Sequence, residues 1–99
     1  MLFSWFDAAD AKKFGTSLGL FFAEKMPSTK GFGDKAFEMK ANKVLKQMSE
    51  QIARFKQQQR LNTYKKAQLG NAFKWALKDA GIEPEYADKL TQWLMLQVG

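Results

Sequence analysis

The sequence predicts an all-α protein, a small single-domain bundle of about four helices. These helices are expected at approximately residues 7–26, 35–60, 64–80 and 84–98. Apolar residues recur at three- and four-residue steps, and no segment alternates with the period of two that is typical of a strand. Pro27, Gly81 and Pro84 fall at the ends of these periodic stretches, where helices stop or start. Because 99 residues support one core, residues 1–99 are expected to form one domain.

The first helix is expected to begin after Asp7 as its cap and to end before Pro27, which cannot continue a helix. Gly15 and Gly19 lie one turn apart on it. They could allow the backbone of another helix to approach closely, or they could simply cost the helix stability. The segment 27–34 is expected to be a loop and not a phosphate-binding loop, because it lacks the preceding strand and the required spacing.

The second helix is expected to begin after Asp34. Its apolar stripe comprises Phe37, Ala41, Val44, Leu45, Met48, Ile52 and Phe55. On the opposite side, a helical projection gathers four cations, Lys40, Lys43, Lys46 and Arg54. Glu50 is placed to form an i,i+4 ion pair with Arg54.

A turn is expected near Asn62 and Thr63, because continuing the stripe of the second helix would place three turns of polar residues inward. Thr63 is the expected cap of the third helix, and Gly81 is expected to close that helix. The third helix has the inward stripe Leu69, Ala72, Phe73, Ala76, Leu77 and Ala80. Pro84 is expected to start the fourth helix, whose acidic first turn suits the positive end of the helix dipole.

The four stripes together predict the core. Its expected members are Phe14, Leu18, Phe22, Val44, Met48, Ile52, Phe73, Leu77, Leu90 and Trp93.

Trp75 departs from the third stripe and falls in a largely polar row with Tyr64 and Lys78. Two interpretations follow. Other aromatic residues of the chain, Phe3, Trp5, Phe6 or Phe32, could cover Trp75, or Trp75 could belong to a contact surface, where Trp and Tyr concentrate binding energy.

Positive charge is concentrated in residues 35–66, where nine basic residues face only Glu38 and Glu50. This segment carries a net charge of +7, whereas the whole chain carries +6. Such an asymmetry indicates either an anionic partner or a well-solvated helix face.

The composition excludes several kinds of chemistry. The chain has no Cys and no His, so disulfides, Cys/His zinc sites and imidazole-dependent catalysis are ruled out. The acidic residues lack calcium-loop spacing. No catalytic residue, cofactor or metal is therefore expected. The apolar N-terminus lacks the features of a signal peptide, and the apolar stretch 18–23 is too short to span a membrane, so a cytoplasmic location is expected.

These observations predict a non-enzymatic protein that binds a macromolecular partner, and they favour another protein as that partner. The expected binding residues are Trp75, Tyr64 and Lys78 together with Lys40, Lys43, Lys46 and Arg54. The alternative is a nucleic-acid-binding protein whose four cations on the second helix contact the phosphate backbone without reading bases.

Overall fold

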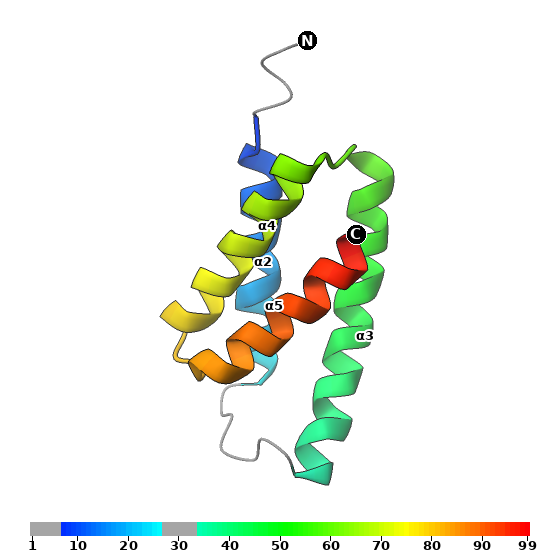
Figure 1. Ribbon diagram of the computed structural model, residues 1–99. Coiled ribbons are helices and arrows are strands. Elements are labelled where there is room, and N and C mark those ends of the chain that lie inside the picture. The colour runs from blue at the N-terminus through cyan, green and yellow to red at the C-terminus, as the bar shows by residue number, and fades with distance from the viewer. Residues whose placement is uncertain (1–6, 27–33) are drawn as a thin grey trace.

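The structure is a computed structural model that describes residues 7–26 and 34–99. Within them the chain forms four helices and no strand, which confirms the predicted all-α bundle (Figure 1). The helices are α2 (Ala9–Lys25), α3 (Lys35–Gln58), α4 (Thr63–Asp79) and α5 (Pro84–Val98). The expected loop 27–34 lies outside the described residues apart from Asp34, as do Phe3, Trp5, Phe6 and Phe32.

The helices α2 and α4 lie side by side and run in the same direction, whereas α3 and α5 run the opposite way (Figure 1). The molecule is elongated, with extents of 48 × 23 × 19 Å. The longest helix is α3, whose 24 residues span about 36 Å.

The interface between α2 and α4 is the most extensive in the bundle, and the two glycines of α2 make it possible. A Cβ atom on Gly15 would overlap with the main-chain carbonyl oxygen of Leu69. A Cβ on Gly19 would lie 2.7 Å from the Cβ of Ala76 and 3.0 Å from the carbonyl oxygen of Phe73. Of the two interpretations of this glycine pair, close backbone approach is therefore the one that the structure supports.

Large side chains, by contrast, hold α3 against its neighbours. The rings of Phe14 on α2 and Phe55 on α3 are stacked with their centroids 4.1 Å apart. Tyr86 of α5 lies near both Phe22 and Phe37, at centroid distances of 5.8 and 5.6 Å. Backbones separated by aromatic rings cannot approach as closely as α2 and α4 do.

Most of the predicted core is confirmed. Eight of the ten residues are buried, and the other two, Phe14 and Trp93, are partly buried and pack against the same cluster. Ala80 was wrongly assigned to the core stripe. It is exposed because the helix ends there and Ala80 serves as the C-cap of α4.

The helix ends agree with the predictions to within two residues, but the N-caps of α2 and α4 differ. Ala8, not Asp7, is the N-cap of α2, although a carboxylate oxygen of Asp7 accepts a hydrogen bond of 3.2 Å from the N–H of Ala9. Asn62, not Thr63, is the N-cap of α4, and its side-chain oxygen accepts a hydrogen bond of 2.8 Å from the N–H of Lys65. Gly81 closes α4 as expected. It adopts φ +91°, and the N–H of Ile82 reaches back to the carbonyl oxygen of Leu77, as in a Schellman motif.

Candidate functional site

Trp75 lies on the outer side of α4 with 63% of its surface exposed. Leu69, Phe73 and Leu77 of the same helix are completely buried. The difference is one of rotation, because Trp75 follows Phe73 by two residues and therefore projects about 160° away from it. The predicted departure of Trp75 from the stripe is confirmed. The aromatic residues that could cover it, Phe3, Trp5, Phe6 and Phe32, lie outside the described residues.

Lys78 stands beside the indole ring, with its amino nitrogen 5.8 Å from the ring centroid, within the range of a cation–π contact. The carboxylate of Asp88 on α5 lies close to this part of α4. It lies 3.1 Å from the amino nitrogen of Lys74 and 3.9 Å from that of Lys78. One carboxylate faces two ammonium groups, so these three groups together keep one positive charge. Sequence reasoning missed this contact of Asp88, because only the tertiary structure places the first turns of α5 beside α4.

Tyr64 is 36% exposed but does not belong to the same cluster as Trp75. The two residues are eleven positions apart on α4, which corresponds to about 17 Å along the axis. Leu20 of α2 is another exposed apolar residue, with 54% of its surface accessible. Because α2 and α4 run in parallel with Gly19 against Ala76, helical projection places Leu20 and Trp75 on the same outer side of this helix pair. We call Trp75, Lys78 and Leu20 the aromatic surface.

The four cations predicted on the second helix are all exposed along α3. Lys40, Lys43, Lys46 and Arg54 extend over about 21 Å of the helix axis. None of them forms an ion pair with a carboxylate of residues 7–26 or 34–99. The expected pair between Glu50 and Arg54 is likewise not formed, because an ion pair between two exposed side chains gains too little energy in water to fix their rotamers. We call these four cations the basic face.

A groove of about 420 Å³ lies between α3 and α5, with Phe37, Leu45 and Tyr86 among its walls. Burial raises the pKa of the Tyr86 phenol above its usual range, and the nearby carboxylate of Glu38 raises it further. The phenol therefore stays protonated at neutral pH. Sequence reasoning did not predict this groove, because its walls come from the flanks of two separate stripes.

Comparison with known proteins gives no identification. No protein-family model, curated protein or solved structure matches this chain significantly.

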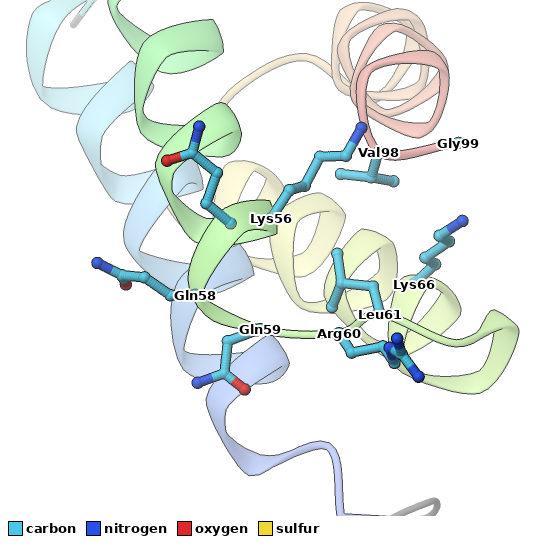
Figure 2. Close-up of a pocket in the computed structure, with 9 residues that line it drawn as sticks. Lys56, Gln58, Gln59, Arg60, Leu61, Lys66, Val98 and Gly99 are labelled. Carbon is cyan, nitrogen blue, oxygen red and sulfur yellow. The ribbon is translucent and has the colours of Figure 1, made fainter.

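A second cavity, of about 480 Å³, lies where the end of α3, the α3–α4 turn, α4 and the end of α5 meet (Figure 2). Its lining includes three cationic side chains, Lys56, Arg60 and Lys66, and no carboxylate side chain; its one anionic group is the main-chain carboxylate of the last residue, Gly99, so the net charge of the lining is positive. The sequence showed these residues only as part of the basic segment 35–66. Their grouping depends on the turn that brings Lys66 to the same cavity as Lys56.

Among the described residues, no group of three or more acidic side chains is arranged to hold a metal ion. No helix in the described part of the chain is long and apolar enough to cross a membrane.

Proposed function

We propose that this protein acts without catalysis, by binding a protein partner through the aromatic surface of Trp75, Lys78 and Leu20. The observation that carries the proposal is the 63% exposure of Trp75 in a small domain. Three other large apolar side chains of α4, Leu69, Phe73 and Leu77, are fully buried. Exposing an indole forgoes the burial of a large apolar side chain, which contributes on the order of 2 kcal/mol to folding. Binding to a partner would recover that contribution.

The chemistry of the surface indicates the kind of partner. Trp75 and Leu20 offer apolar contact area, and the small side chain of Ala76 lies at the seam between their two helices. Lys78 adds positive charge beside the ring. A complementary protein segment presents apolar side chains next to carboxylates, because opposite charges at the rim favour encounter and fix the register of docking.

Replacing Trp75 with Gln tests this proposal. An exposed side chain contributes little to folding, so we expect the free energy of unfolding to change by less than about 1 kcal/mol. Partner binding should be lost, as expected for an aromatic hot spot. The measurements are urea denaturation and capture of partners from the source cell by immobilised protein, with and without nuclease.

Leu96→Gln is the matched control, because Leu96 is 81% exposed on α5 and lies outside the aromatic surface. It should leave both stability and capture unchanged. A large loss of stability in Trp75→Gln would instead mean that other residues of the chain cover the indole, and the proposal would then be wrong.

Nucleic acid is the second candidate partner, and one observation favours it. The basic face presents four exposed cations along α3 without an ion-paired carboxylate from the described residues. Such a row can follow a phosphate backbone and release its counterions, without reading base edges.

Reversing two of these charges, in Lys43→Glu with Lys46→Glu, tests the second candidate. Folding stability should barely change, because both side chains are exposed. Affinity for DNA or RNA of any sequence should fall, and the slope of log affinity against log salt should shrink by roughly one for each phosphate that the protein no longer neutralises. Fluorescence anisotropy with a labelled oligonucleotide measures both quantities.

The double variant Lys12→Glu with Lys13→Glu is the control, since it makes the same change of net charge on exposed positions of α2. It should weaken binding less than the α3 variant does. If the wild-type protein gives no anisotropy change even at low salt, where electrostatic binding is strongest, the basic face is a solvated surface only.

A further inference from the structure

Of the three cations that line the cavity at the α3–α4 turn, only Lys56 forms a hydrogen bond that joins two helices of the described chain. The amino group of Lys56 donates a hydrogen bond of 3.2 Å to the carbonyl oxygen of Gln97, in the last turn of α5. This hydrogen bond places a positive charge at the negative end of the α5 dipole, which stabilises the helix terminus. Lys56 therefore has a structural role.

Arg60 and Lys66 have no such role in the structure. Neither forms an ion pair with any carboxylate of the described residues. Leu61 and Val98 lie between them and Lys56 in the cavity (Figure 2). Cations that line the same hollow add their fields there, so Arg60 and Lys66, which have no carboxylate partner among the described residues, create a stronger local positive potential than single cations on a convex helix face.

We propose that this cavity binds a small anion that carries two phosphate groups. The guanidinium of Arg60 has the planar, forked donors that match phosphate oxygens, and Lys66 adds a point charge for the second group. No aromatic side chain lines the cavity, so it offers no surface on which a ring system could stack. The site is separate from the aromatic surface and goes beyond the proposed function.

Titration calorimetry with inorganic pyrophosphate at constant ionic strength tests the proposal. The wild-type chain should bind one pyrophosphate per molecule, and orthophosphate should bind more weakly because it offers one phosphate group. The double variant Arg60→Gln with Lys66→Gln should bind pyrophosphate about tenfold or more weakly, since it removes both charge-assisted interactions.

The control is Lys43→Gln with Lys46→Gln, which removes the same amount of charge from the basic face of α3. It should keep the affinity for pyrophosphate within about twofold, because those charges are screened from the cavity. Equal losses of affinity in the two variants would show that pyrophosphate responds only to the overall positive field, and the proposal would be wrong.

A second measurement uses the unmodified chain, so its result does not depend on whether the double variant folds. In ¹H–¹⁵N NMR spectra, pyrophosphate should shift amide signals of residues 56–66 and 97–99 and leave those around Trp75 in place. Absence of these shifts, or shifts centred on the basic face, would overturn the assignment of the site.

Discussion

Gly15→Ala should lower the free energy of unfolding by about 2 kcal/mol or more, although alanine is the better helix former by about 1 kcal/mol. The added methyl group would overlap with the carbonyl oxygen of Leu69 and lie 3.2 Å from the Cβ of Ala72. The obstacle at Leu69 is main chain, which cannot rotate out of the way as a side chain can. The helices α2 and α4 would have to separate, and packing along their whole interface would weaken.

Gly70→Ala is the matched control in the partner helix. The atoms that a Cβ at Gly70 would meet belong to the Met95 side chain, with the sulfur at 2.7 Å. Methionine is flexible and can move aside, so this variant should be close to neutral or slightly stabilising. Urea denaturation measures the free energy of unfolding of both variants. A Gly15→Ala protein as stable as Gly70→Ala would contradict the close α2–α4 packing.

Ile52→Ala should cost about 2–5 kcal/mol, the range expected when a large aliphatic side chain is truncated in a filled core. Ile52 is 2% exposed and belongs to the main apolar cluster. Truncation removes part of the apolar surface that joins α3 to the rest of the bundle. For a domain of this size, such a loss is a large fraction of total stability.

Leu96→Ala is the comparison, because Leu96 is 81% exposed and its truncation should change stability by less than about 0.5 kcal/mol. Thermal or denaturant unfolding measures both variants. A similarly small change for Ile52→Ala would place Ile52 at the surface and refute the assignment of the inner face of α3.

The candidate surfaces could be predicted from the sequence only in part. Helical projection showed that Trp75 points away from the stripe and that Lys43 lies opposite the core, because both statements depend on rotation within one helix. It did not show that Asp88 lies near Lys78, or that Lys66 and Lys56 line the same cavity. Those relations join different helices, and nothing in the local pattern specifies them.

The four helices, most of the core and the position of the turn between α3 and α4 follow from the sequence alone. These features depend on the spacing of apolar residues along one helix and on residues such as Pro84 and Gly81, whose conformational limits act locally. The role of Gly15 and Gly19 depends on the packing of the helices, because two glycines cost a helix stability wherever they occur and are useful only where a second backbone meets them. The parallel arrangement of α2 and α4 supplies that backbone, and it also places Leu20 and Trp75 on one side of the bundle.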